Sequence, residues 1–323
     1  MLEEILSVLN LTKYFVTRKG IFSSSKKQDK AVDGISFALK KGEVLVLAGE
    51  SGSGKTTTAR LILRAIEPDS GKVFFDGIEV GKQRKNLDNL RLQCQMIHQD
   101  PYAAINPRMK ISDIIIEPLE IHKIGTNQER KKMAIDALRE VRLEPAEEIY
   151  NKYPHMLSGG QRQRIVLARA LVTKPKVIIA DEPVSMLDVS VRAEVLELMR
   201  ELQKKYGISY IYITHDLSTA RYLGQRIAIM YRGKIVEIGP IDEVLFHPRH
   251  PYTQALIDAI SEADPDNLKR DKKIRIKESY GVDIDDGCRF RSRCPYAIEK
   301  CKDEPTLDKV GEDRRAACFV KID

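Results

Sequence analysis

The sequence contains no tryptophan, only 6% aromatic residues and only five cysteines. No uninterrupted apolar run exceeds five residues, so the sequence predicts no helix that could cross a bilayer. The first residues, Met1-Leu-Glu-Glu-Ile, are acidic where a secretory signal is basic, and their apolar stretch is too short for one. We therefore expect the chain to stay in the cytosol.

Length and composition indicate a globular protein with a sizeable core. The chain has 323 residues, 42% of them apolar and 31% charged. This length predicts one large α/β domain with an appendage, or two domains. Lys and Arg total 54 against 47 Asp and Glu, a net charge of +7. That charge suits a nucleotide, a nucleic acid or an acidic membrane face, without choosing among them.

Strand and helix patterns alternate along the chain. Apolar strands are predicted at 43–48, 72–75, 177–180 and 209–213, and helices at 57–66, 130–142 and 191–204. This alternation predicts a mostly parallel sheet covered by helices. The polar residues 20–30 predict a loop between two strands. A charged stretch after residue 262 places a domain boundary there, which gives an ATPase domain at 1–262 (with helices at about 100–172) and an extension at 263–323.

Residues 49–56, GESGSGKT, match the phosphate-loop pattern G-x-x-x-x-G-K-[ST] between a strand and a helix. The glycines let the backbone curl so that its N–H groups point at phosphate oxygens, and the helix adds its positive N-terminal end. Lys55 is expected to bridge the terminal phosphates, and the Thr56 hydroxyl to bind Mg²⁺. An ordinary Gly/Ser turn is the alternative, and the Lys-Thr pair at this offset disfavours it. The expected ATP-binding residues of this loop are Gly49, Glu50, Ser51, Gly52, Ser53, Gly54, Lys55, Thr56 and Thr57.

Residues 177–182, VIIADE, predict a buried strand that ends in two carboxylates. Asp181 at the strand tip can reach Mg²⁺, and Glu182 can orient and activate the attacking water. A solvated acidic turn is the alternative. Upstream, residues 157–161, LSGGQ, open a helix and have the composition of a phosphate-binding nest.

These motifs, in this order, resemble those of the ATP-binding-cassette (ABC) ATPases, whose signature is LSGGQ ahead of the Asp-Glu pair. The resemblance implies an α/β P-loop NTPase fold with a mostly parallel core sheet, an antiparallel β subdomain and an inserted helical subdomain. It also implies catalytic roles for Glu182, His215 and Gln99. In the family the glutamine contacts Mg²⁺ and the γ-phosphate, and the histidine holds that phosphate.

The resemblance extends to residues with weaker signals. Phe15 matches the aromatic residue that stacks on adenine, with Tyr14 as the alternative and a core position as the other reading of Phe15. Gln99 could likewise be an ordinary loop residue. Ser185 and Asp188 match the loop through which two subunits of such a pair communicate.

The family geometry implies a head-to-tail pair of subunits, in which each ATP lies between one phosphate loop and the other subunit's signature. The signature residues would therefore act on ATP bound to the partner; they are Leu157, Ser158, Gly159, Gly160 and Gln161. Since the chain carries one set of motifs, we expect it to pair with a copy of itself or with a related chain.

Three segments narrow the resemblance to oligopeptide and dipeptide importers: 99–108 (QDPYAAINPR), 181–190 (DEPVSMLDVS) and 250–256 (HPYTQAL). Residues 18–22 and 31–37 are more like the F-type than the D-type ATPase subunit. The resemblance implies an ATPase on the cytoplasmic face of the membrane that drives peptide uptake through two permeases. An external solute-binding protein would be an indirect partner. Residues 102–108 would line a groove for a permease helix.

Other functions stay open at this point. Related machines import oligosaccharides or nickel. A soluble ABC ATPase that acts on nucleic acid or ribosomes is an alternative of another class, but such proteins commonly carry two cassettes or zinc insertions. We therefore expect no nucleic-acid partner. A regulatory subunit without turnover is disfavoured because Lys55, Glu182 and His215 are all present.

Four of the five cysteines lie near the C-terminus, at Cys288, Cys294, Cys301 and Cys318. A reducing cytosol makes disulfides a poor expectation and metal a better one. The spacing lacks the short knuckles of zinc sites and suits a [4Fe–4S] cluster, which some peptide-importer ATPases carry in a similar segment. Zinc and four reduced structural cysteines are the alternatives. Cys94 is expected to be a small buried residue.

Overall fold

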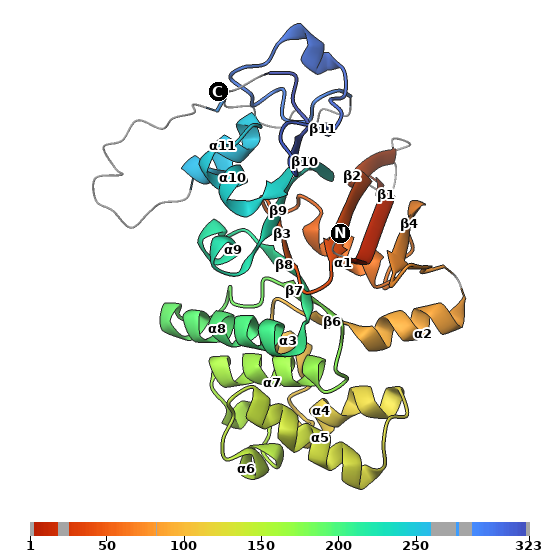
Figure 1. Ribbon diagram of the computed structural model, residues 1–323, viewed down its shortest axis with the longest axis vertical. Coiled ribbons are helices and arrows are strands. Elements are labelled where there is room, and N and C mark those ends of the chain that lie inside the picture. The colour runs from red at the N-terminus through yellow and green to blue at the C-terminus, as the bar shows by residue number, and fades with distance from the viewer. Residues whose placement is uncertain (1–2, 19–25, 82, 260–275, 278–285, 321–323) are drawn as a thin grey trace. The chain divides into compact units, whose positions relative to one another are not determined.

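The computed structural model describes residues 3–18, 26–81, 83–259, 276–277 and 286–320, and the chain divides into two compact units (Figure 1). Unit 1 comprises residues 1–6, 39–43 and 74–212. Unit 2 comprises residues 7–38, 44–73 and 213–323. Strands β1, β2, β4 and β8 pass from one unit to the other along the chain.

The strands of unit 1 build a parallel core. β6 (Cys94–Ile97) pairs in parallel with β7 (Val177–Asp181), from Cys94 opposite Val177 to Ile97 opposite Ala180. The first part of β8 (Ser209–Thr214) is the next strand beside β7. Every residue of β7 and β8 is buried, as expected of strands covered on both faces. The end of β4 (Ser70–Phe75) forms a tight antiparallel pair with β5 (Ile78–Glu79).

Helices form most of unit 1. Between β5 and β7 the chain forms α2 (Arg84–Gln93), α3 (Pro101–Ala104), α4 (Ile111–Ile121), α5 (Asn127–Glu140), α6 (Ala146–Tyr150), η1 (Pro154–Met156) and α7 (Gly159–Leu171). α8 (Val189–Tyr206) follows β7. Helices α4 to α7 pack on one another and form one helical group (Figure 1). Capping boxes start α5 at Thr126 and α7 at Ser158, so both helix starts are fixed by local side chains.

Unit 2 continues from strands into the C-terminal segment. β3 (Val44–Ala48) is parallel to β9 (Arg226–Tyr231), which is antiparallel to β10 (Lys234–Pro240). The short strands β12 (Arg315–Ala316) and β11 (Asp308–Lys309) extend this order beyond β10. Most of β1 (Glu4–Arg18) and β2 (Lys26–Lys40) belongs to this unit, and the two strands are neighbours. Its helices are α1 (Lys55–Ile62), α9 (Leu217–Leu223), α10 (Ile241–Phe246), α11 (Pro251–Asp258) and η3 (Glu299–Lys302).

The C-terminal segment is fastened to β10 by a buried ion pair. The guanidinium of Arg314 donates to the carboxylate of Glu237, and neither side chain is exposed by more than 5%. Glu237 also accepts from the backbone N–H groups of Arg249 and His250, at 3.0 Å each. Because a buried charge is stable only when its hydrogen bonds are made, this carboxylate holds three stretches of chain together.

The expected fold class is confirmed, and two local predictions are wrong. The helix after the phosphate loop ends at Ile62 because the backbone of Arg64 turns into the left-handed region at a φ of 52°. Residues 26–30, expected in a loop, belong to β2, which is the neighbour of β1; strand formation depends on such pairing as well as on the residue types. Residues 20–25 of that loop and the boundary at 262 lie outside the described residues.

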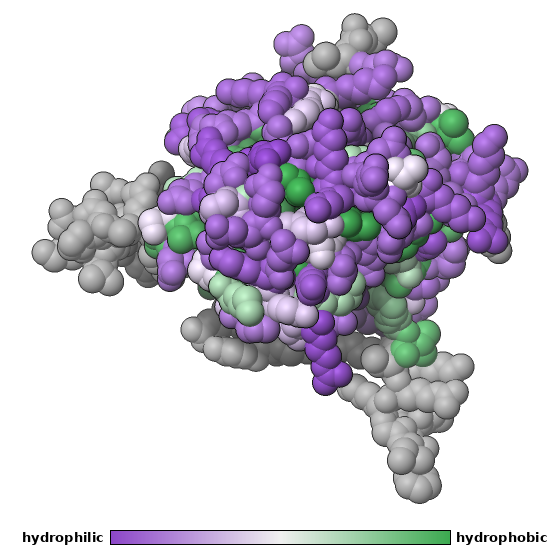
Figure 2. All heavy atoms as spheres, turned by 90° about the horizontal axis from the view of Figure 1, so that it is seen from below, coloured by the Kyte–Doolittle hydropathy of each residue, from purple (hydrophilic) through white to green (hydrophobic). Residues whose placement is uncertain are grey.

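No helix among the described residues is long and apolar enough to cross a membrane. Seen from below, hydrophilic side chains cover most of the surface, and hydrophobic ones form small separate groups (Figure 2).

Candidate nucleotide-binding site

The phosphate loop follows β3 directly in unit 2, and its glycines have conformations that other residues adopt at a cost. Gly49 and Gly54 have φ values of 152° and 104°. A Cβ on Gly49 would lie 2.2 Å from the carbonyl oxygen of Met230, and one on Gly54 would lie 2.1 Å from that of Ala31. These two positions therefore require glycine on steric grounds.

Lys55 begins α1 and is buried within the loop. Its Nζ atom donates to the carbonyl oxygens of Gly49 at 2.8 Å and Glu50 at 2.9 Å. Thr56 and Thr57 are half-buried in the first turn of α1, where backbone N–H groups have no partner within the helix. A cation and a helix N-terminus at one loop form a site suited to phosphate.

The two candidate adenine aromatics differ in accessibility. The Tyr14 hydroxyl donates to Asp33 Oδ1 at 2.6 Å, and burial together with this bond raises the pKa of Tyr14 to about 12. Phe15 is 39% exposed, with the Lys13 ammonium 5.8 Å from its ring centroid. Phe15 is therefore the aromatic with a face available for stacking.

His215 lies in the turn between β8 and α9, and its side chain is exposed. The next residue, Asp216, caps α9 by accepting from the backbone N–H groups of Ser218 at 2.9 Å and Thr219 at 3.4 Å. This cap fixes the turn that carries the histidine.

In unit 1, the structure brings two predicted catalytic residues together. β7 ends at Asp181, which is buried, and Glu182 follows with a backbone φ of 47°. Gln99 Nε2 donates to Glu182 Oε2 at 2.9 Å. The Ser185 hydroxyl donates to the Glu182 carbonyl oxygen at 3.0 Å, so both ends of this residue are held.

The LSGGQ residues form the start of α7. The Ser158 hydroxyl accepts from the Gln161 backbone N–H at 3.3 Å, and the Gln161 side chain accepts from the Ser158 N–H at 3.0 Å. Leu157 is buried, and Ser158 is exposed. A Cβ on Gly159 would make only ordinary contacts, the nearest 3.8 Å from the Tyr102 hydroxyl oxygen, whereas a Cβ on Gly160 would lie 2.4 Å from Val191 Cγ1 of α8.

Exposed apolar residues lie at the start of α8 and just before α7. Met156 precedes it, and Met186 and Val189 flank Asp188 at the start of α8. Tyr102 is also exposed, and its ring carries the Arg162 guanidinium 4.4 Å from the centroid. The sequence did not reveal this contact, which joins the segment after Gln99 to α7.

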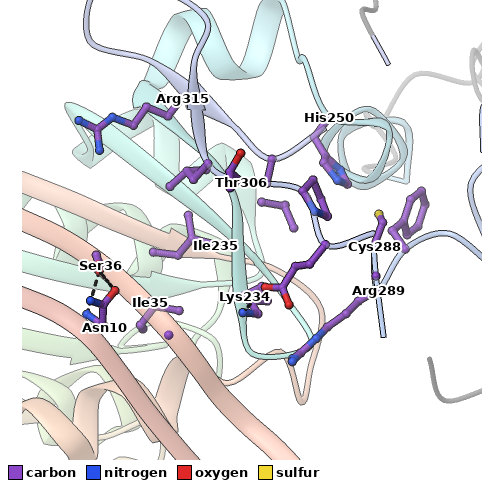
Figure 3. A pocket seen from close by; sticks show the side chains of 18 residues that line it. Asn10, Ile35, Ser36, Lys234, Ile235, His250, Cys288, Arg289, Thr306 and Arg315 are labelled. Atoms are coloured by element: carbon purple, nitrogen blue, oxygen red, sulfur yellow. Dashed lines mark hydrogen bonds and ion pairs between the residues drawn. The ribbon is translucent and has the colours of Figure 1, made fainter. Parts of the chain in front are cut away.

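The four C-terminal cysteines are brought together in unit 2. Cys288, Cys294, Cys301 and Cys318 all line one small cavity, together with His250. Burial and the neighbouring thiols raise the pKa values of Cys288, Cys294 and Cys318, the last to about 11. Within the described ranges no three His, Cys, Asp or Glu side chains are arranged to hold a metal ion. Cys288 also lies on a second cavity of about 480 Å³, beside Arg289 and His250 (Figure 3).

The prediction for the fifth cysteine is confirmed. Cys94 is 2% exposed at the start of β6, and burial raises the pKa of its thiol to about 12.

Sequence reasoning missed the residues that hold Glu50. The Tyr252 hydroxyl accepts from the Glu50 N–H at 2.8 Å, and the Arg293 guanidinium pairs with the Glu50 carboxylate. Since 202 and 243 positions separate these partners along the chain, no local pattern could have indicated the contacts.

Comparison with known proteins assigns the class and the family. The family described as ABC transporter matches residues 32–185, and the C-terminal region of the oligopeptide/dipeptide transporters matches residues 236–301. A probable peptide ABC transporter ATP-binding protein of Sinorhizobium fredii is 42% identical, covering 99% of this chain and 91% of its own. The di/tripeptide transport ATP-binding protein DppF of Pseudomonas aeruginosa is 41% identical over 98% of both chains.

Solved structures agree with this class. A dimeric ATP-binding cassette in a post-hydrolysis state with ADP and phosphate has a TM-score of 0.64 and 28% identity, covering 73% of this chain and 98% of its own. A cassette of a Clostridium perfringens ABC transporter complex has a TM-score of 0.65 and 28% identity, covering 76% and 92%. The chain therefore belongs to the ATP-binding subunits of ABC transporters, ATPases coupled to transport, and among them to the oligopeptide/dipeptide transporter family.

Proposed function

We propose that this chain hydrolyses ATP to drive the uptake of di- and oligopeptides through partner membrane permeases. The observation that carries this proposal is full-length similarity: the relatives named for peptide transport match 98% or more of the chain, including its cysteine-bearing end. The partners we propose are a second ATPase subunit, two permeases and, indirectly, an extracytoplasmic solute-binding protein. The chain would act at the cytoplasmic face of the membrane.

ATP would bind at the phosphate loop of unit 2. In the structure Lys55 already points its ammonium at loop carbonyl oxygens, and the β- and γ-phosphates would replace those acceptors. The N–H groups at the start of α1 would add neutral donors. Phe15 would stack on adenine with its exposed face.

Mg²⁺, when bound, would be held by the donors that the family resemblance implies, namely the Thr56 hydroxyl, the Gln99 amide oxygen and the Asp181 carboxylate. Oxygen donors of this kind are those that Mg²⁺ prefers, and the ion would neutralise phosphate charge when bound. Asp181 is buried at the tip of β7, so its carboxylate is fixed by a rigid strand.

Hydrolysis would depend on Glu182 and His215. Glu182 would accept a proton from the attacking water, since a carboxylate at the end of a rigid strand can serve as a general base. The hydrogen bond from Gln99 holds the carboxylate, and His215 would hold the γ-phosphate from its capped turn. Such catalysis consists mainly of positioning and charge stabilisation.

The signature at the start of α7 would act on ATP bound to the other subunit. Ser158 is exposed, and the first N–H groups of α7 have no partner within the helix. The exposed side chains of Met186 and Val189, beside Asp188, would be covered when two subunits associate. Ser185 lies in the same loop, through which the two subunits would communicate. Residues 102–108 would receive a permease helix, and the Tyr102–Arg162 contact would carry its movement to α7.

We propose that the four C-terminal cysteines hold a [4Fe–4S] cluster, with zinc as the alternative occupant. Four soft thiols on one cavity form a suitable donor set for such a cluster. Such a centre would tie together the stretches of chain that carry the four cysteines.

The transport proposal is tested in vesicles that contain this chain with its permeases and partner ATPase. We expect ATP-dependent accumulation of a labelled dipeptide, abolished by Lys55→Ala and absent with a non-hydrolysable ATP analogue. Accumulation of nickel or an oligosaccharide in place of the peptide would overturn the proposed substrate.

The cysteine proposal is tested by anaerobic purification with iron, sulfide and zinc analysis. We expect brown protein with iron and sulfide in equal amounts, both lost in Cys294→Ser. Colourless protein with stoichiometric zinc would assign the site to the alternative metal, and protein without either would refute a metal centre.

A further inference from the structure

The C-terminal segment contacts the phosphate loop through one residue, Glu50. Arg293 Nη1 donates to Glu50 Oε2 at 3.0 Å, and Nη2 donates to Oε1 at 3.1 Å. This two-pronged geometry matches the planar fork of a guanidinium to a carboxylate and fixes direction as well as distance. Arg293 Nη1 also donates to the Tyr231 hydroxyl at 3.3 Å, which holds the guanidinium from a second side.

The backbone of Glu50 is held from the same side of the loop. Its N–H donates to the Tyr252 hydroxyl at 2.8 Å, and Tyr252 is 1% exposed. The Tyr252 ring packs against Tyr231 and Phe290, with centroids 4.5 and 5.5 Å away. Phe290 and Arg293 both lie between Cys288 and Cys294, so the same short segment supports both contacts.

Glu50 is in turn bonded to the lysine of the loop. Its carbonyl oxygen accepts from Lys55 Nζ at 2.9 Å. A continuous path of contacts therefore runs from the segment 288–294, through the side chain and backbone of Glu50, to the ammonium group of Lys55.

We propose that Arg293 is a positioning residue for ATP: it holds Glu50, and through it the phosphate loop, in the conformation that binds the nucleotide. This inference rests on the proposed role of residues 49–56 in binding ATP. Without the ion pair, the loop would have to be ordered when ATP binds, and the entropy of that ordering would weaken binding. The chemical step would be unaffected, since Arg293 touches neither the water nor the phosphates in this scheme.

The test is a double-mutant cycle on the full chain, with affinity for a fluorescent ATP analogue as the first readout and KM and kcat as the second. We expect Arg293→Gln and Glu50→Gln each to weaken binding about threefold, the scale of a partly exposed ion pair. In Arg293→Gln, KM should rise by a similar factor with kcat unchanged. The double variant should be no weaker than either single one, because both remove the same interaction.

Three variants make the cycle decisive. Arg293→Lys keeps the charge but loses the fork, so it should recover only part of the affinity. Arg315→Gln removes an exposed arginine elsewhere in the C-terminal segment and should change nothing. Lys55→Ala should abolish binding, and if it does not, the proposed role of the loop fails rather than this inference.

Unchanged affinity in Arg293→Gln, or effects of the two substitutions that simply add, would overturn the inference. Additive effects would mean that Glu50 acts on the nucleotide independently of Arg293. If Arg293→Gln impairs folding, Arg293→Lys still tests the pair, because it keeps the charge beside Cys294 and loses only the two-pronged geometry; it should then weaken affinity with kcat unchanged.

Discussion

Glu182 has a left-handed backbone, with a φ of 47°, which costs a residue with a side chain about 1 to 2 kcal/mol. Two hydrogen bonds hold it there, from Gln99 to its carboxylate and from Ser185 to its carbonyl oxygen. Unfavourable conformations of this kind concentrate where a side chain must be aimed. The geometry therefore supports the catalytic role proposed for this carboxylate.

Replacing Glu182 with Gln should separate binding from hydrolysis. The amide has nearly the same shape but cannot take a proton, so we expect hydrolysis to slow about a hundredfold or more. Affinity for ATP should be retained, as measured with a fluorescent analogue. Glu201→Gln, which alters an exposed carboxylate on α8, is the control and should have wild-type turnover.

Some functional residues were predictable because their pattern is local, and others were not. Lys55 and Thr56 stand at fixed offsets from glycines, and Asp181 and Glu182 end an apolar run. The Gln99–Glu182 bond joins two motifs that the family resemblance already selected. Arg293 had no such signal, because its partner Glu50 depends on how distant segments fold together.

Among the helices, α7 and α8 meet most closely at a glycine. Gly160, in the first turn of α7, faces Val191 of α8, and an added Cβ would lie 2.4 Å from a valine methyl group. The close approach of the two helices there depends on the missing side chain. This gives the second signature glycine a packing role besides its proposed contact with the partner's ATP.

If Gly160 has this packing role, its replacement should have different effects on stability in two backgrounds. Gly160→Ala in the wild-type chain should lower the free energy of unfolding by about 1 to 3 kcal/mol through overpacking. The same substitution made in a Val191→Ala background should be neutral or stabilising, because alanine favours the helix once the clash is gone. Urea titrations of the four proteins measure both effects, and equal losses in the two backgrounds would contradict the packing role.

Helix α11 is capped by a histidine that cannot easily become charged. His250 Nδ1 accepts from the Tyr252 N–H at 3.0 Å, and complete burial lowers the pKa of His250 to about 3. On acidification the His250 imidazole of the unfolded chain takes up a proton near pH 6.5, whereas that of the folded chain stays neutral there. The histidine's contribution to stability is thus complete above pH 6.5 and is lost as the pH falls toward 3.

We therefore expect stability to decline on acidification more steeply in the wild-type chain than in His250→Asn. The asparagine oxygen can still cap α11 but does not titrate in this range. Between pH 6 and 4 the difference in free energy of unfolding between the two proteins should shift by up to about 1.4 kcal/mol per pH unit. Parallel curves from urea titrations at several pH values would rule out this role of His250.

At the scale of the whole molecule, the chain has one phosphate loop and one signature, and the proposed reaction needs one of each from different subunits. The fold class could be predicted because the motifs and the alternation of strands and helices are encoded locally. The ion pairs that fasten the C-terminal segment could not, because Glu237 and Arg314 are 77 positions apart with no local pattern between them.

If the pair is the active unit, ATP turnover per chain should fall on dilution, and Ser158→Ala should lower turnover at every concentration. Turnover measured over a wide range of protein concentration, with sedimentation in parallel, checks both points. Ser158 also caps α7, a contribution of about 1 kcal/mol, so Thr126→Ala, which removes the equivalent cap of α5, is the matched control. Full turnover at high dilution would contradict the two-subunit site.

The salt bridge between Arg314 and Glu237 also decides whether the protein can be shortened. A chain cut before residue 314 would remove the cationic partner of the Glu237 carboxylate, together with strand β12 that pairs with β10 beside it. Removing one member of such a pair costs about 3 to 5 kcal/mol, a large part of a domain's total stability. The fold of the ATPase therefore depends on the cysteine-bearing tail. Truncated versions made for crystallisation or expression should be poorly soluble.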